Sequence, residues 1–188
     1  MSSRRQELEE LERGLLCEEN RLYLRRLRAT APSLAQFEDW GQVVALLRAE
    51  AREGDKADPL LRPILSAWRE SRESLWAEVL LVAFWPTLES LHRHKTAWER
   101  DEEERWQSLT FAFLQAIRRL DPKVATCGLA RSIGNRTIHY FHDQCRARRR
   151  SKGHEIAKAP ADLDALAEGA ACRRPRGGRR PLSPMWSP

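Results

Sequence analysis

The sequence contains no long uncharged apolar run. The longest one, from Val79 to Pro86, is eight residues, whereas a membrane-spanning helix needs about 20 consecutive apolar residues. The first residues, from Met1 to Glu12, are rich in acids and have no apolar stretch, which is unlike a secretion signal. We therefore expect a cytoplasmic protein that does not have a membrane as a partner.

Cysteines are few and widely separated. The four of them, Cys17, Cys127, Cys145 and Cys172, form no C-x-x-C pair. Pairs at short spacing are typical of zinc sites, and dense cysteines are typical of secreted disulfide frameworks. We therefore expect reduced thiols and no bound metal.

Glycine and proline are sparse between residues 3 and 150, and no run alternates apolar and polar residues for long enough to form a strand. Leu, Ala, Arg and Glu, which favour helices, dominate instead. The pattern predicts an all-α fold.

Most of the chain has almost no net charge. Residues 1–145 hold 22 basic and 23 acidic side chains, and residues 146–188 hold 11 basic and 4 acidic ones, so the two parts carry −1 and +7 and together give +6. The excess positive charge therefore lies entirely near the C-terminal end. Basic segments of this kind favour partners that carry phosphate.

We expect three parts along the chain. These are a helical N-terminal extension at 1–58, a helical domain at 59–150, and a basic, largely disordered tail at 151–188, where proline, glycine and arginine accumulate. Within the extension, the leucine spacing predicts one helix over 3–28. Ser33 and Gln36 have the pattern of a capping box, which predicts a second helix over 34–52.

The central domain begins with a helical stretch after Pro59. The next helix, which begins near Ser74, is apolar on all sides and is therefore the predicted core helix. Pro86 should kink or divide it, because proline has no backbone N–H.

Two more helices complete the domain. Asp101 and the three glutamates that follow it open one of them, where acids interact favourably with the helix dipole. Spacings of three and four predict its buried stripe, which consists of Trp106, Leu109, Phe113, Ile117 and Leu120. Asp121 and Pro122 have the pattern of an N-cap and a first helical residue, so the last helix should run from there to about Arg150.

The last helix should have two faces of different chemistry. Its buried face consists of Leu129, Ala130, Ile133, Thr137, Ile138, Phe141 and Cys145. The opposite face carries Arg131, Asn135, His139, Asp143 and Arg146, with Tyr140 nearby and with Arg148, Arg149 and Arg150 as an extension. Arginine neutralises phosphate, asparagine pairs with base edges and aromatic rings stack on unpaired bases, so the mixture indicates nucleic-acid binding. An ordinary solvated face with a basic end is the alternative.

Several segments of this domain also carry a family pattern. The last helix reads LARSIGNRTI at 129–138 and DQCRARRR at 143–150, and the preceding helix reads DEEERWQSLTFAFL at 101–114. Together they resemble region two of bacterial RNA polymerase sigma factors, in which an acidic helix with Asp-x-x-Gln-x-x-Phe precedes Leu-x-x-Ile-Ala-x-Asn, Asp-x-x-Arg and an arginine-rich end. The resemblance covers roughly residues 75–150 and implies an orthogonal helical bundle.

The resemblance implies a role for each face. The clamp helices of RNA polymerase core would be contacted by Asp101, Glu104, Gln107 and Ser108. The single-stranded segment of the melted promoter DNA would be bound by Arg131, Asn135, Arg136, His139, Tyr140, Arg146, Arg148, Arg149 and Arg150. The implied function is transcription initiation by a sigma-factor-like DNA-binding protein that captures unpaired bases and makes or breaks no bond.

The chain departs from this family in three respects. Gly134 stands where the family usually has alanine, and the first 70 residues are not explained by region two. Residues 151–188 are too short and too rich in Pro, Gly and Arg to form the second, helix-turn-helix domain that sigma factors normally carry. Two other hypotheses stay open: a non-catalytic helical protein-interaction module that has lost promoter recognition, and nonspecific nucleic-acid binding by the basic tail.

We do not expect an enzyme. The sequence has no Gly-rich phosphate loop, no G-x-S-x-G elbow and no H-E-x-x-H. His139, His142 and Asp143 lie at a spacing that could reach a metal, but no second cluster completes a site. We therefore predict no catalytic residue, no metal, no cofactor and no small-molecule substrate.

Overall fold

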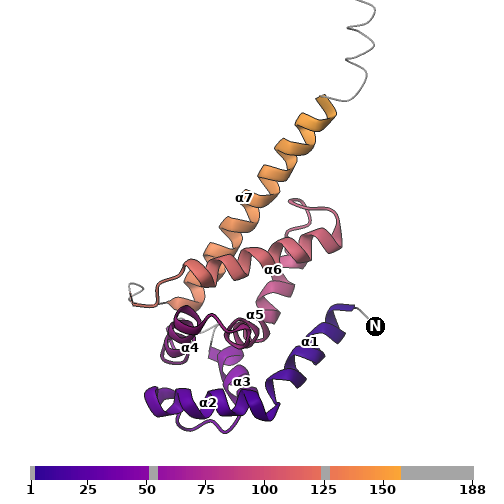
Figure 1. The fold of residues 1–188 in the computed structure, drawn as a ribbon. Coiled ribbons are helices and arrows are strands. Elements are labelled where there is room, and N and C mark those ends of the chain that lie inside the picture. Colours follow the sequence, from indigo (N-terminus) through magenta and orange to yellow (C-terminus); the bar gives the residue numbers. More distant parts are fainter. Residues whose placement is uncertain (1–2, 51–54, 124–127, 158–188) are drawn as a thin grey trace, which may run out of the picture. The chain divides into compact units, whose positions relative to one another are not determined.

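The computed structural model describes residues 3–50, 55–123 and 128–157. These ranges contain seven α-helices, one short 3₁₀ helix and no strand, which confirms the predicted all-α fold (Figure 1). The elements are α1 (Ser3–Leu15), α2 (Glu18–Thr30), η1 (Pro32–Leu34), α3 (Trp40–Glu50), α4 (Asp58–Ser71), α5 (Ser74–His94), α6 (Glu102–Arg119) and α7 (Leu129–Ala157).

Residues up to Ala147 form one compact unit, and residues from Arg148 onward form another. Of the second unit, the structure describes the helical residues 148–157, which carry α7 past its predicted end near Arg150. The rest of the predicted basic tail, 158–188, lies outside the described residues. In the part of the chain that the structure describes, no helix is both long and apolar enough to cross a membrane.

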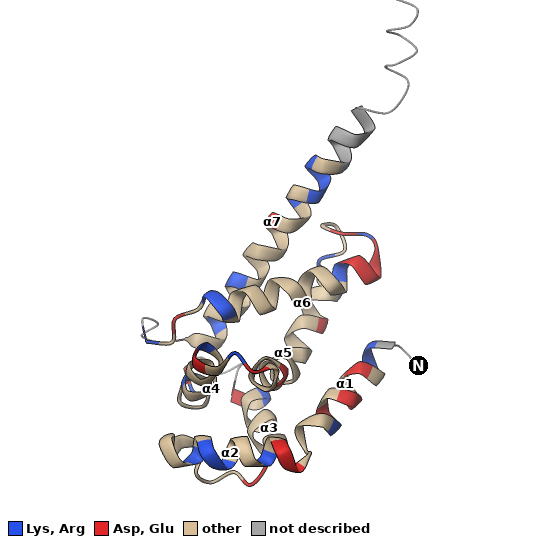
Figure 2. Ribbon diagram, in the orientation of Figure 1, with Lys and Arg blue, Asp and Glu red and all other residues tan. Residues whose placement is uncertain are grey.

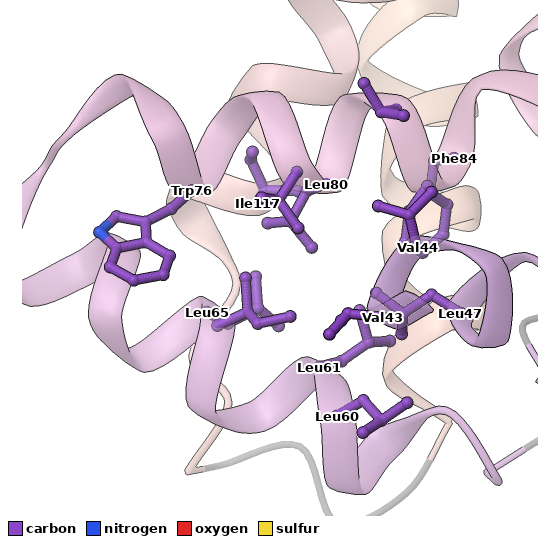
Figure 3. Packing of buried hydrophobic residues seen from close by; sticks show 14 of the residues in the cluster. Val43, Val44, Leu47, Leu60, Leu61, Leu65, Trp76, Leu80, Phe84 and Ile117 are labelled. Atoms are coloured by element: carbon purple, nitrogen blue, oxygen red, sulfur yellow. The ribbon is translucent and has the colours of Figure 1, made fainter. Parts of the chain in front are cut away.

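The core of the first unit is built around α5, which contacts α1, α3, α4 and α6. As predicted, α5 is buried on several sides, with Val79, Leu80 and Trp85 at 1% exposure or less. Figure 3 shows Val43 of α3 and Leu61 of α4 directed into the same cluster. Burial of such a side chain contributes about 1.5–3 kcal/mol, so helices on both sides of the expected boundary at 58/59 stabilise one common core.

Two helices contain internal prolines, and each is supported from another element. A proline at position i leaves the carbonyl of residue i−4 without its helical donor. In α4, Pro63 leaves the carbonyl of Pro59, and the Ser33 hydroxyl donates to it at 2.7 Å. In α5, Pro86 does not divide the helix, because a side chain from α3 donates to the freed carbonyl of Val82.

The predicted first helix over 3–28 is two helices, α1 and α2. The break follows Gly14, a residue that weakens helices, and the Gly14 carbonyl accepts from the Cys17 backbone N–H at 3.2 Å and from the Asn20 side chain at 2.8 Å. The Asn20 carbonyl in turn accepts from the indole of buried Trp40 at 2.8 Å. The turn is thus fixed by side chains that satisfy its backbone groups.

The predicted capping box at Ser33 and Gln36 is wrong. The Ser33 hydroxyl is used by the Pro59 carbonyl, and α3 begins later, at Trp40. There Asp39 caps the helix by accepting from the backbone N–H of Gln42 at 2.9 Å, and the Gln42 side chain accepts from the Glu38 backbone N–H at 3.0 Å. A capping arrangement therefore exists, but six residues further along the chain.

The predicted start of the last helix is also wrong. Asp121 lies in a turn after α6, where it pairs with Arg69 at 3.2 Å, and α7 begins only at Leu129. The residue before it, Gly128, has φ +67°, a value that favours glycine. The first N–H of α7, that of Leu129, donates to the buried carboxylate of Asp58 at 2.8 Å. The cap thus comes from α4 and not from the adjacent sequence.

Candidate nucleic-acid interface

The two predicted faces of α7 are present in the first unit. The buried side consists of Leu129, Ala130, Ile133, Thr137, Phe141 and Cys145, each at 5% exposure or less, with Ile138 half-buried. The outward side carries the exposed residues Arg131, Asn135, His139, Asp143 and Arg146. The structure therefore places the predicted guanidinium, amide and imidazole groups together on one accessible face.

The inward side of α7 is held by several contacts. Phe141 is fully buried and stacks on Trp98, with ring centroids 5.7 Å apart, and it packs with Leu109 of α6. The buried Thr137 hydroxyl is satisfied because it donates to the Ile133 carbonyl at 2.8 Å. Together with the Asp58 cap, these contacts fix the rotation of α7 and thus which side chains face outward.

Tyr140 lies at the edge between the two faces. It is half-buried against the apolar cluster that joins α6 and α7, and the guanidinium of Arg119 lies over its ring at 5.2 Å from the centroid. One turn earlier on α7, Arg136 is exposed. Tyr140 therefore supports a guanidinium at this edge, and an unpaired base would compete with Arg119 for its ring.

The part of α7 that lies in the first unit carries a net positive charge. Between Leu129 and Ala147, α7 carries Arg131, Arg136 and Arg146 against one acid, Asp143, a sum of +2. Figure 2 shows basic segments on α7 and at the C-terminal end of α6, and an acidic segment at the opposite end of α6. Phosphate groups are attracted to such a surface.

The predicted arginine extension belongs to the second compact unit. Arg148, Arg149 and Arg150 follow one another on the helix and are all exposed. Within that unit they form a short, dense basic segment.

The predicted polymerase-binding residues lie at the N-cap and in the first two turns of α6, and not all of them are accessible. Asp101 is exposed and caps the helix, accepting from the Glu104 backbone N–H at 2.7 Å. Gln107 is exposed and donates to Glu103 at 3.1 Å. Ser108 is only 1% exposed, because it lies on the inward side of α6 one turn before buried Ala112. It does not belong to a surface that a partner can reach.

Three exposed residues on α6 are absent from the predicted sites. Phe111 is 54% exposed, and Arg118 and Arg119 are exposed in the last turn. The signal for Phe111 was present: it lies two residues from both Leu109 and Phe113 in the buried stripe, so it projects to the opposite side of the helix.

The two histidines of α7 at metal-ligand spacing, His139 and His142, lie in different environments. His139 is exposed, whereas His142 packs edge-on against Trp98, with ring centroids 4.8 Å apart. Among the described residues, no three His, Cys, Asp or Glu side chains come together in an arrangement that could hold a metal ion.

His92 has a different, structural environment between α1, α5 and α6. Its Nε2 donates to the Glu102 carbonyl at 3.0 Å, so its Nδ1 is the acceptor for Arg4 at 2.8 Å. Arg4 also pairs with the Glu102 carboxylate and lies over the Trp106 ring. Burial lowers the pKa of His92 below its ordinary value, and the positive charge of Arg4 acts in the same direction. Neutral His92 therefore joins three helices.

No protein-family model matches the sequence, and no curated protein or solved structure matches it either. The resemblance to region two of sigma factors stays a prediction that rests on the quoted segments of this chain.

Proposed function

We propose that this protein binds nucleic acid through the outward face of α7. The observation that supports the proposal most directly is the common exposure of Arg131, Asn135, His139 and Arg146 on one helix whose other side is buried. Mixed guanidinium, amide and imidazole groups on a rigid helix suit a ligand that has both phosphates and base edges.

Each side chain has a role that follows from its chemistry. Arg131 and Arg146 hold phosphates on either side of Asn135, whose amide both donates to and accepts from a base edge. His139 lies between Asn135 and Arg146 along the same face and offers a ring for stacking or a hydrogen-bond donor. Unpaired bases expose both their edges and their faces, so the preferred ligand is single-stranded.

The more specific form of the proposal comes from the family resemblance. In that form the ligand is the melted promoter strand, and RNA polymerase core in the cytoplasm is the partner. Asp101, Glu104 and Gln107 at the beginning of α6 provide the contact with the polymerase. The protein then acts as a sigma-factor-like initiation protein and has no catalytic role of its own.

The experiment is a binding titration with a labelled single-stranded oligonucleotide and with its duplex, by fluorescence anisotropy at two salt concentrations. Asn135→Ala should reduce sequence discrimination by about 1–3 kcal/mol per lost base contact. Arg131→Ala should weaken all sequences alike. Arg13→Ala removes an exposed arginine of α1 and is the matched charge control. Equal losses in Arg13→Ala and Arg131→Ala would contradict the proposal.

The proposed contact with the polymerase is tested separately, by adding bacterial RNA polymerase core to the protein. Under the specific form, the complex contains this protein, and Gln107→Ala weakens its retention while single-stranded binding by α7 is unchanged. Retention without any nucleic-acid binding would instead favour a protein-interaction module.

A further inference from the structure

The outward side of α6 carries a band of five residues with a regular order. Glu104, Gln107, Phe111, Gln115 and Arg118 follow one another at spacings of three, four, four and three residues, which keeps them on one side of the helix. Gln107, Phe111 and Arg118 are exposed, and Glu104 and Gln115 are half-buried. We refer to these five residues as the α6 band.

Phe111, at the centre of the α6 band, is largely exposed to solvent. It is 54% exposed, the highest value among the exposed large apolar side chains of the described residues. The other four residues of the band are polar, so Phe111 is the single aromatic ring of the band and is exposed to solvent. Aromatic rings of this kind are enriched at protein–protein contacts.

The charges of the α6 band have opposite signs at its two ends. Glu104 lies in the first turn of α6 and Arg118 in the last turn, each seven residues from Phe111. At a rise of about 1.5 Å per residue, each charge lies about 10 Å from the centre. Figure 2 shows the acidic and the basic end of α6.

The α6 band is complementary to a second copy of itself that runs in the opposite direction. An antiparallel copy centred on Phe111 brings Phe111 onto Phe111, each Gln107 beside a Gln115, and each Glu104 beside an Arg118. A parallel copy would bring like charges together at both ends. Gln107 already donates to Glu103 at 3.1 Å, which leaves its carbonyl oxygen to accept from the second copy's Gln115.

We propose that two copies of this chain associate through the α6 band, antiparallel and related by a twofold axis that passes near Phe111. In such an isologous contact, the Phe111–Phe111 pair lies on the axis and occurs once, and every other residue pair occurs twice. This contact uses no residue of the outward face of α7 and does not depend on nucleic-acid binding. It shares Glu104 and Gln107 with the polymerase contact proposed above, so the dimer and that polymerase complex exclude each other. In this dimer the exposed ring of Phe111 packs against the Phe111 ring of the second copy.

The association should be weak. One helix from each copy buries less than the roughly 1,200–2,000 Å² typical of stable, specific complexes. Sedimentation equilibrium of the full chain from about 10 µM to about 1 mM should therefore show a reversible rise from monomer to dimer mass. A constant monomer mass over this range would overturn the proposal.

Phe111→Ser is the first variant, and Leu22→Ser is its control. Leu22 is 44% exposed on α2, outside the band. Phe111→Ser should weaken dimerisation about tenfold or more, since the central aromatic pair is lost, and Leu22→Ser should leave it unchanged. Equal dimerisation of the Phe111→Ser variant and the unaltered chain would overturn the proposal.

Charge reversal tests the antiparallel pairing itself. Glu104→Arg alone and Arg118→Glu alone should each be monomeric, because like charges then face each other at both ends. An equimolar mixture of the two single variants should dimerise, because opposite charges then face each other at both ends. A mixture that stays monomeric, although far-UV circular dichroism shows both variants folded, would overturn the antiparallel arrangement. If either charge variant is unfolded, the comparison of Phe111→Ser with the unaltered chain decides whether the α6 band is the dimer contact.

Discussion

The guanidinium of Arg48 donates to the backbone carbonyl of Val82, from Nε at 3.2 Å and from Nη2 at 2.9 Å. This carbonyl lies one turn before Pro86, which cannot donate to it. Arg48 also pairs with Glu12 of α1 at 2.8 Å. One side chain of α3 thus satisfies the core helix at its proline and connects it to the N-terminal helix.

Removal of this guanidinium should destabilise the protein through the orphaned carbonyl. We expect Arg48→Leu to lower the free energy of unfolding by about 1–3 kcal/mol, the usual cost of an unsatisfied buried polar group. In a Pro86→Ala background the Val82 carbonyl regains a helical donor, so Arg48→Leu should cost clearly less. Urea denaturation of the four proteins in this cycle measures the difference. Equal costs in both backgrounds would show that the carbonyl is not the reason.

The stability of the fold should fall at mildly acidic pH because of His92. Its pKa is lowered in the folded protein, first by burial and then by the nearby positive charges of Arg4 and Arg105. As the pH falls below about 6.5, the unfolded state takes up a proton on this group before the folded state does, so the equilibrium shifts toward unfolding. Thermal denaturation between about pH 7.5 and pH 5 should show this loss, and His92→Gln should reduce the slope. An unchanged slope in that variant would assign the loss to other groups.

The cap from α4 should be a measurable part of the stability of α7. Asp58 is buried and accepts from the Leu129 N–H, and Arg62 lies 3.8 Å from its other oxygen. We expect Asp58→Ala to cost about 1–2 kcal/mol, the usual range for loss of a helix cap. Asp58→Asn should cost less, since its amide oxygen still accepts. Chemical denaturation measures both, and equal costs would argue against the cap.

The salt dependence of binding should distinguish the α7 face from the basic tail. Each phosphate contact on a single strand adds about 0.7 to the slope of log affinity against log salt. Arg131→Gln with Arg146→Gln should therefore lower the slope by about 1.4. A chain ending at residue 157 should keep its preference for single strands over duplex. Complete loss of binding in the shortened chain would support the nonspecific tail hypothesis instead.

Local patterns predicted α6 and the two sides of α7 well. The start of α6 at its acidic residues and the buried stripe from Trp106 to Leu120 are confirmed, because each depends on residues within a few turns of one another. The exposed and buried sides of α7 follow from the same periodicity. Where helix spacing alone decides an orientation, the sequence is sufficient to predict it.

Two of the wrong predictions, those for Ser33 and Asp121, depend on groups that are distant in the sequence. Ser33 does not cap a helix because the Pro59 carbonyl, 26 residues away, takes its hydroxyl. Asp121 pairs with Arg69 through one oxygen and accepts from the Lys123 backbone N–H through the other, whereas α7 begins at Leu129, where Asp58 of α4 supplies the cap. The local pattern of these residues is genuine, but the partner that decides their role lies elsewhere in the sequence.

The Asp58 cap also bears on the order in which the chain folds. Its carboxylate and the Leu129 N–H are 71 residues apart, so the loop between them has to be closed before the first turn of α7 gains this bond. During synthesis α4 emerges long before α7, and the carboxylate is then in place when Leu129 arrives. We therefore expect the first turn of α7 to gain this bond late in folding. The Leu129 amide should exchange with solvent at the rate at which α4 opens. Formation of the candidate binding face is therefore coupled to α4, a helix that contributes no residue to that face.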